Sequence, residues 1–345
     1  MLQTAKTYRL SGNFPESQRG TDPSATILKI PRTVLSGVNV MSIPSSLVSH
    51  SISPARIARV DAQGWPVVSL CGVEITLTHA LGALARIISR PRCPDLPPLA
   101  VVSANLDHLY HFGTGSRFHG VTQASTQRGD LEWLTLLDGA PLVTKAARLT
   151  GMEWPRLAGS DLTLPIIAAA AATNLRVGFL GGAPETADAL RSILSQRFPE
   201  LQVAGLWCPE RDDLATTERS LALADAVREA GADLLFVGLG KPRQELWIAQ
   251  YGPATGSRVM LAFGAAGDFI AGKVRRAPEW MIRAHAEWAF RLSQEPRRLA
   301  GRYLVRGPFD YLHLRSDHGT ASAPTPTQIE RWSRCAQSAL STTNG

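Results

Sequence analysis

The stretch ADLLFVGLGKPRQE, residues 232–245, decides the fold class. Its first half is an apolar run of strand length, and its second half is a glycine turn followed by the polar beginning of a helix. An apolar strand that leads into a helix is typical of a parallel α/β sheet, in which both faces of the strand are buried. The turn carries Lys241, Arg243 and Gln244. Their side chains can converge on a diphosphate or on sugar hydroxyls, and the alternative is an ordinary solvated helix start.

The same alternation of strand and helix recurs along the chain. Other apolar runs end in polar turns at residues 103–105, 181–185 and 264–268, and stretches with helical spacing separate them. We therefore predict a doubly wound α/β fold with a mostly parallel, Rossmann-like sheet. The helices include segments around 216–230 and 242–250. Because ligands bind at the carboxyl ends of such strands, one crevice is expected to contain all of these turns.

Composition divides the 345 residues into four parts. A Ser- and Thr-rich stretch predicts a poorly ordered extension over 1–60, and the alternating pattern predicts the α/β core over 61–272. Residues 273–316 are predicted to form a basic helical appendage, since ten Lys and Arg residues stand there against four Asp and Glu residues. The last part, 317–345, has loop composition and is expected to be a flexible tail.

The net charge of +7 indicates an anionic partner. We expect no nucleic acid, because the excess charge is confined to the appendage and no nucleic-acid-binding module is recognisable. Trp280, Trp288 and Phe290 lie among the arginines of the appendage, which suits an anionic membrane surface; the alternative is an amphipathic helix packed on the core. The longest apolar run, residues 165–172, is too short to span a bilayer, and the N-terminus lacks an apolar signal region, so export is not expected.

Spacing disfavours several kinds of site. The four cysteines lie far apart without a CxxC pair, which argues against a zinc site and a disulfide framework. His108 and His111 have no recognisable third ligand, and the chain contains no Asp-x-Asp, so we expect no metal. No GxGxxG opens a helix with an acidic residue about twenty positions later, which disfavours an oxidoreductase on a Rossmann-like sheet and leaves it as the alternative function. No cofactor is expected.

A short stretch around Asp138 raises the question of a catalytic site. Asp138 and Gly139 end an apolar run, and Arg156 follows. Asp138 is either a general base or a turn aspartate, and Arg156 either steers a phosphate or lies at the surface. Ser160 and Asp161 are interpreted as the cap of the next helix.

Two other segments can bind phosphate. The turn FLGGAPE, residues 179–185, can direct backbone N–H groups and a helix N-terminus at a phosphate, although an ordinary βα turn has the same composition. Arg297 and Arg298 of the appendage can bind a phosphate directly.

In their order along the chain, these motifs resemble the WecG/TagA/CpsF family of glycosyltransferases of bacterial surface polysaccharide synthesis. The resemblance implies transfer of N-acetylmannosamine or another hexose from a UDP-sugar donor to a polyprenyl-diphosphate-linked sugar acceptor. It also implies inversion at the anomeric carbon, no metal requirement, and a peripheral position on the cytoplasmic face of the cell membrane. The motifs are Ser103-x-Asn105, Asp138-Gly139-x-Pro141, Arg156 with GSDL, FLGG, VGLGKPRQE, DFIAGKVRRAP, Glu287-Trp288 and EPRRLAGRY.

Carried over position by position, the resemblance assigns Asp138 as the base that deprotonates the acceptor hydroxyl and Asn105 as a sugar-positioning residue beside it. Arg156 matches an acceptor- or phosphate-binding cation. The remaining expected substrate-binding residues are Ser103, Gly181, Gly182, Lys241, Gln244, Glu245, Arg297, Arg298 and Arg302.

The chain departs from the family's pattern at several positions, including Ala286 before Glu287-Trp288 and an extra loop at 112–120. Gly267 precedes Asp268 where the family usually has an aromatic residue, and Pro155 stands where an acidic residue is common before Arg156. A homo-oligomer is compatible with the sequence, which does not specify the oligomeric state.

Overall fold

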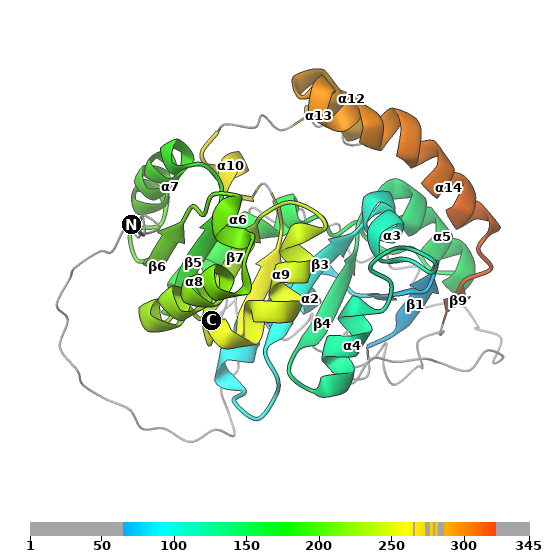
Figure 1. Cartoon of the computed structure of the whole chain (residues 1–345). Coiled ribbons are helices and arrows are strands. Elements are labelled where there is room, and N and C mark those ends of the chain that lie inside the picture. Colours follow the sequence, from blue (N-terminus) through cyan, green and yellow to red (C-terminus); the bar gives the residue numbers. More distant parts are fainter. Residues whose placement is uncertain (1–64, 265, 273–276, 279, 282–285, 322–345) are drawn as a thin grey trace, which may run out of the picture.

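The chain forms one sheet with helices on both faces (Figure 1), so the predicted doubly wound α/β fold is confirmed. The predicted extension over 1–60 lies outside the described residues. The computed structural model describes residues 65–264, 266–272, 277–278, 280–281 and 286–321.

Within these residues the sheet has nine strands, in the order β6-β5-β7-β8-β3-β4-β2-β1-β9. All pairs from β6 to β2 are parallel, whereas β1 runs antiparallel to both β2 and β9. The connections after the neighbouring strands β5 and β7 lead to opposite sides, to β6 and to β8, and such a switch point is where α/β sheets bind ligands. The strands are β1 Val67–Leu70, β2 Val73–Thr76, β3 Leu99–Ala104, β4 Glu132–Leu137, β5 Arg176–Gly181, β6 Gln202–Trp207, β7 Leu234–Gly238, β8 Val259–Ala262 and β9 Thr320–Ala321.

The stretch PVVSLCGVEI, residues 66–75, is apolar and strand-like in sequence, and it contains two strands joined by a tight turn. Cys71 and Gly72 both have positive φ, 49° and 76°. Two such residues match the right-handed twist of antiparallel strands, so the chain reverses within two residues. The parallel sheet therefore ends in an antiparallel hairpin at this edge.

Helices cover both faces of the sheet, and the predicted helices around 216–230 and 242–250 are confirmed as α8 and α9. The helices of the core are α2 Ala80–Ser89, α3 Leu106–Phe112, α4 Val121–Arg128, α5 Ala140–Thr150, α6 Gly159–Ala172, α7 Pro184–Arg197, α8 Thr217–Ala230, α9 Arg243–Tyr251 and α10 Ala266–Ile270.

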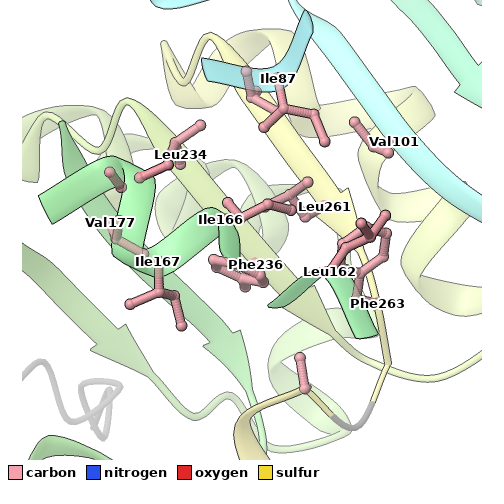
Figure 2. Close-up of a cluster of buried hydrophobic side chains, with 14 of the residues drawn as sticks. Ile87, Val101, Leu162, Ile166, Ile167, Val177, Leu234, Phe236, Leu261 and Phe263 are labelled. Carbon is pink, nitrogen blue, oxygen red and sulfur yellow. The ribbon is translucent and has the colours of Figure 1, made fainter. Parts of the chain in front are cut away.

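Two apolar layers sandwich the sheet because successive side chains of a strand point to opposite faces. In β7, Leu234 and Phe236 join the cluster under α2, α6 and α7, whereas Leu235 joins the cluster under α8 and α9. Figure 2 shows the first cluster, with Ile166 of α6 beside Leu261 of β8. Apolar side chains cover both faces of the sheet, so its polar groups lie at the strand ends.

A buried ion-pair group connects α2 to the amino end of β4. The carboxylate of Glu132, the first residue of β4, pairs with Arg86 of α2 and lies 2.6 Å from a guanidinium nitrogen of Arg90. Arg90 also donates to the carbonyl of Pro97 at 2.8 Å. This group lies at the end of β4 opposite to Asp138.

The described part of the appendage is helical. It comprises α12 Glu287–Gln294, α13 Pro296–Ala300, a π-helix η5 Gly301–Arg306 and α14 Gly307–Ser316. Figure 1 shows these helices in orange as an arch that ends with α14 beside α3 and α5.

The chain then returns to the sheet. Asp317 accepts a hydrogen bond from the backbone N–H of Cys71 at 2.8 Å, and β9 pairs with β1. The first residues assigned to the predicted tail thus extend the sheet, while 322–345 lie outside the described residues. Among the residues that the structure describes, no helix is both long and apolar enough to cross a bilayer.

Candidate active site

Asn105 and Asp138 lie side by side at the carboxyl ends of β3 and β4. Asn105 caps α3, because its Oδ1 accepts from the backbone N–H of His108 at 3.3 Å. Its Nδ2 donates to Oδ2 of Asp138 at 3.4 Å, and Oδ1 of Asp138 accepts from the N–H of Gly139 at 2.7 Å. Gly139 has a φ of 80°, which L side chains rarely adopt. Both carboxylate oxygens of Asp138 are therefore oriented by fixed donors.

The guanidinium group of Arg156 contacts three carboxylates, one of which is that of Asp138. Its Nη2 lies 2.9 Å from Asp161, and its Nη1 lies 3.1 Å from Glu287 and 3.7 Å from Asp138. Burial acts to lower the pKa of Arg156, but the carboxylates of Asp138, Asp161 and Glu287 outweigh it and raise that pKa. Arg156 is thus a permanent cation at the edge of the site.

The structure corrects the interpretation of Ser160 and Asp161 as a helix cap. The residue at the N-cap of α6 is Ala158, which makes no side-chain cap, and α6 begins at Gly159. Asp161 lies in the first turn and pairs with Arg156 instead. Gly159, the first residue of α6, is closely packed, because a Cβ there would lie 2.6 Å from the ring of Phe263.

A buried polar layer connects β3 and β8 to α9. Nζ of Lys241 donates to the carbonyl of Ser103 at 2.8 Å, and Nε2 of Gln244 donates to the carbonyl of Ala262 and to Glu245 at 2.8 and 3.1 Å. Ser103 itself donates through Oγ to the carbonyl of Leu157 at 3.1 Å. The structure therefore engages these predicted binding residues in contacts with one another and with strand ends.

Burial changes the ionisation of the charged pair in this layer. Burial lowers the pKa of Lys241, and burial raises the pKa of Glu245, whose carboxylate lies 4.0 Å from Lys241. Oε1 of Gln244 and Oε2 of Glu245 are buried without a hydrogen-bond partner in the described part of the chain. A buried polar atom without a partner costs free energy of folding. Such atoms are common at sites that bind a polar ligand.

A pocket lies at the carboxyl ends of β5, β7 and β8, on the other side of this layer. A Cβ on Gly181 would lie 2.5 Å from the carbonyl of Gly238, so only glycine allows β5 and β7 to approach so closely. Gly182, with a φ of 82°, faces open space before α7 begins at Pro184. The lining also includes Thr186, Cys208 and Asp268.

Of the three appendage arginines expected at the site, Arg302 contacts the core beside Asn105. Nη1 of Arg302 lies 3.5 Å from Oδ2 of Asp107, which follows Asn105 by two residues. Arg297 is exposed, and the side chain of Arg298 lies outside the described part. Asp107 was not among the residues selected from the sequence, and Glu287 was named only within the Glu287-Trp288 motif. The available signals were an acidic residue in the first helical turn after the Asn105 cap and another inside a basic segment.

His108 packs in the core. It is 1% exposed, its ring stacks on Phe112 with centroids 4.7 Å apart, and burial holds its pKa well below the ordinary value. The described residues contain no group of three or more His, Cys, Asp or Glu side chains that is arranged to hold a metal ion.

Comparison with known proteins identifies similar sequences. The model of the glycosyl transferase WecG/TagA/CpsF family matches residues 68–320. Two proteins named N-acetylglucosaminyldiphosphoundecaprenol N-acetyl-beta-D-mannosaminyltransferase align over 163 residues. That of Bacillus subtilis (strain 168) is 30% identical, and that of Bacillus spizizenii (strain ATCC 23059 / NRRL B-14472 / W23) is 32% identical. Each alignment spans 47% of this chain and 61% of the relative.

Proposed function

Because this chain belongs to the WecG/TagA/CpsF family of glycosyltransferases, we propose that it transfers a hexose from a UDP-sugar to a polyprenyl-diphosphate-linked sugar, with inversion. The names of the two relatives make N-acetylmannosamine the first donor sugar to test and N-acetylglucosaminyl-diphospho-undecaprenol the first acceptor. The oxidoreductase alternative has no support, since the family consists of glycosyl transferases.

The oriented carboxylate of Asp138 carries the proposal. In an inverting transfer the acceptor hydroxyl oxygen attacks the anomeric carbon while the bond from that carbon to the UDP oxygen breaks. The hydroxyl proton passes to a base on the side opposite the departing diphosphate. Asp138, only 14% exposed and held by Asn105 and Gly139, supplies such a base.

The pocket at β5, β7 and β8 suits the donor nucleotide. The N-terminus of α7, a helix of 14 residues, faces it together with the open backbone of Gly182. Helix N-termini and free N–H groups stabilise a diphosphate leaving group. Arg297 and Arg298 are proposed to neutralise the remaining phosphate charge of the donor, and Arg302 is proposed to bind the diphosphate of the acceptor. The reaction is proposed to need no metal.

The appendage is proposed to rest on an anionic membrane, on the cytoplasmic face. Its helices expose large apolar side chains, including Trp288, Leu304, Phe309 and Leu312, the last three at 58%, 71% and 60%. Apolar residues beside arginines bind an interface by burial and by charge together.

Vesicle binding tests the membrane proposal. Phe309→Ser with Leu312→Ser should weaken sedimentation with vesicles that contain anionic lipid, whereas Leu221→Ser, which removes an exposed leucine of α8, should not. Equal binding by all variants would contradict this position of the appendage.

The reaction is tested by UDP release. Purified protein is incubated with a panel of UDP-sugars and a polyprenyl-diphosphate-linked acceptor, with EDTA throughout, and wild type is compared with Asp138→Asn. We expect acceptor-dependent release that survives EDTA and is lost in the variant. Full release by a folded Asp138→Asn protein would show that Asp138 is not the base, and release that stops with EDTA would contradict metal independence.

A further inference from the structure

Two ion contacts of opposite polarity join the appendage to the core. Glu287, in the first turn of α12, gives its carboxylate to Arg156 at 3.1 Å. In η5 the charges are reversed, because Arg302 and Arg306 give guanidinium groups to Asp107 at 3.5 and 4.0 Å. The appendage thus contributes an anion at one end and cations at the other.

Both core partners lie close to Asp138, Arg156 in direct contact with it and Asp107 in the helix whose cap contacts it. The Nη1 atom of Arg156 that binds Glu287 is the same atom that lies 3.7 Å from Asp138. Asp107 lies in the first turn of α3, whose cap Asn105 donates to Asp138. A shift of the Glu287 contact can therefore reach the proposed base through Arg156, and a shift of the Asp107 contact can reach it through the first turn of α3 and its cap Asn105.

The second contact is partly desolvated and reinforced. The side chain of Asp107 is 7% exposed, and the guanidinium of Arg306 lies 4.9 Å from the centre of the Tyr110 ring. A cation over an aromatic face is attracted to it, and a partly buried ion pair is less screened than one in water. Arg302 and Arg306 are four residues apart within the π-helix. π-Helical turns occur frequently at functional sites.

The reversed polarity gives the appendage one register on the core. If the appendage lay reversed end to end, with Glu287 at Asp107 and Arg302 at Arg156, two carboxylates would face each other at one contact and two cations at the other. Repulsion in such like-charge contacts raises the free energy of alternative positions by more than the matching contacts lower that of the observed position. The two contacts therefore determine where the appendage lies and contribute less to how tightly it binds the core.

We infer that Asp107 and Glu287 are positioning residues, which hold the appendage across the site and keep Arg156 and Arg302 in place for the acceptor. The inference rests on the proposed function. The pocket at β5, β7 and β8 has no residue from this arrangement in its lining. Loss of either contact is therefore expected to affect use of the acceptor and to spare binding of the donor.

The test combines hydrogen exchange with kinetics on the full chain. Glu287→Gln and Asp107→Asn each remove one contact without changing shape, and Arg306→Gln loosens the second from the appendage side if Asp107→Asn disturbs α3. Asp107→Glu keeps the negative charge and should preserve docking of the appendage. Asp225→Asn, which breaks an exposed pair with Arg228 on α8 at 2.7 Å, is the matched control.

We expect faster amide exchange over α12 to α14 in the first three variants, with β7 and β8 unchanged. The kcat/KM for acceptor should fall about tenfold or more, as for a misplaced catalytic group, while the KM for the UDP-sugar stays at the wild-type value. Asp107→Glu and Asp225→Asn should behave as wild type.

Unchanged exchange would show that these contacts do not hold the appendage, and faster exchange with unchanged acceptor kinetics would refute the positioning role. Wild-type protein that transfers no sugar would contradict the proposed function instead. The exchange comparison needs no substrate, so it decides the docking in either case.

Discussion

The side chains of Asn105 and Asp138 are joined by a 3.4 Å hydrogen bond although 33 residues separate them in the chain. Each follows the last residue of its strand, and Ala104 is paired with Leu137 across the parallel strands β3 and β4. The sheet register therefore places the pair, which makes the geometry of the proposed base insensitive to loop movement.

Asp138→Asn is expected to lower kcat/KM by about 100- to 10,000-fold, the usual contribution of a general base. The amide retains the size of the side chain but cannot take the proton of the acceptor hydroxyl. Steady-state UDP release measures the effect, and circular dichroism checks the fold. A fall smaller than threefold would remove Asp138 from the mechanism.

Asn105 has two tasks that different substitutions separate. Asn105→Ser retains an N-cap oxygen for α3 and should leave the free energy of unfolding nearly unchanged, whereas Asn105→Ala should lower it by about 1 kcal/mol. Both variants lose the amide donor to Asp138 and should lose activity alike. If the serine variant kept wild-type activity, Asn105 would be a cap and nothing more.

Glu132→Gln should destabilise the protein without impairing the site. It removes the carboxylate that pairs with the buried Arg86 and Arg90, and leaving such charges uncompensated costs about 3–5 kcal/mol. Arg128→Gln breaks the nearby exposed pair with Asp130 and should cost less than about 1 kcal/mol.

Urea unfolding measures both substitutions, and transfer activity under native conditions should survive in each. Equal midpoints for Glu132→Gln and Arg128→Gln would contradict a stabilising role for the buried group.

Asp310 should make docking of α14 depend on pH. Burial, and then the carboxylate of Asp107, raise the pKa of Asp310 to about 6 from an ordinary value of 3.8. A carboxyl whose pKa is raised on folding favours the folded state when protonated, so its stabilising contribution declines between about pH 4 and pH 6 and is absent above.

Asp310→Asn should therefore match wild type near pH 4 and exceed its stability at pH 7. Thermal unfolding and exchange of α14 across this range would show it. Parallel pH profiles for the two proteins would mean that Asp310 ionises in the folded protein as it does in the unfolded chain.

Gly181→Ala and Gly182→Ala are a matched pair for the pocket. The first must place a Cβ 2.5 Å from the carbonyl of Gly238 at a φ of 111°, and we expect a loss of about 2–4 kcal/mol from strain and overlap. The second meets open space and suffers only from its positive φ, about 1–2 kcal/mol.

Thermal unfolding and UDP titration would compare them. UDP affinity should fall in Gly181→Ala because β5 and β7 must separate. Similar stability for the two variants would argue that β5 and β7 can move apart freely.

Local patterns determined the fold class and the positions of most elements. Apolar runs such as 234–238 reveal buried parallel strands, and the helices around α8 and α9 follow from helical spacing. Asp138, Asn105 and Arg156 were candidates from the sequence because each follows a strand end or motif, and the structure brings their side chains together. The hairpin at Cys71 was missed because its turn, Cys-Gly, lacks the usual Asn-Gly or Asp-Gly signal.

Tertiary structure alone decided which charges meet. Arg156 and Glu287 are 131 residues apart, and their contact depends on how the appendage returns across the sheet. Asp161 pairs with Arg156 and does not cap α6, although its position in the sequence suggests that role. Periodicity reports the burial of each residue relative to its neighbours in sequence, whereas ion pairs depend on distances between elements, and those are set only when the whole sheet and its helices have packed.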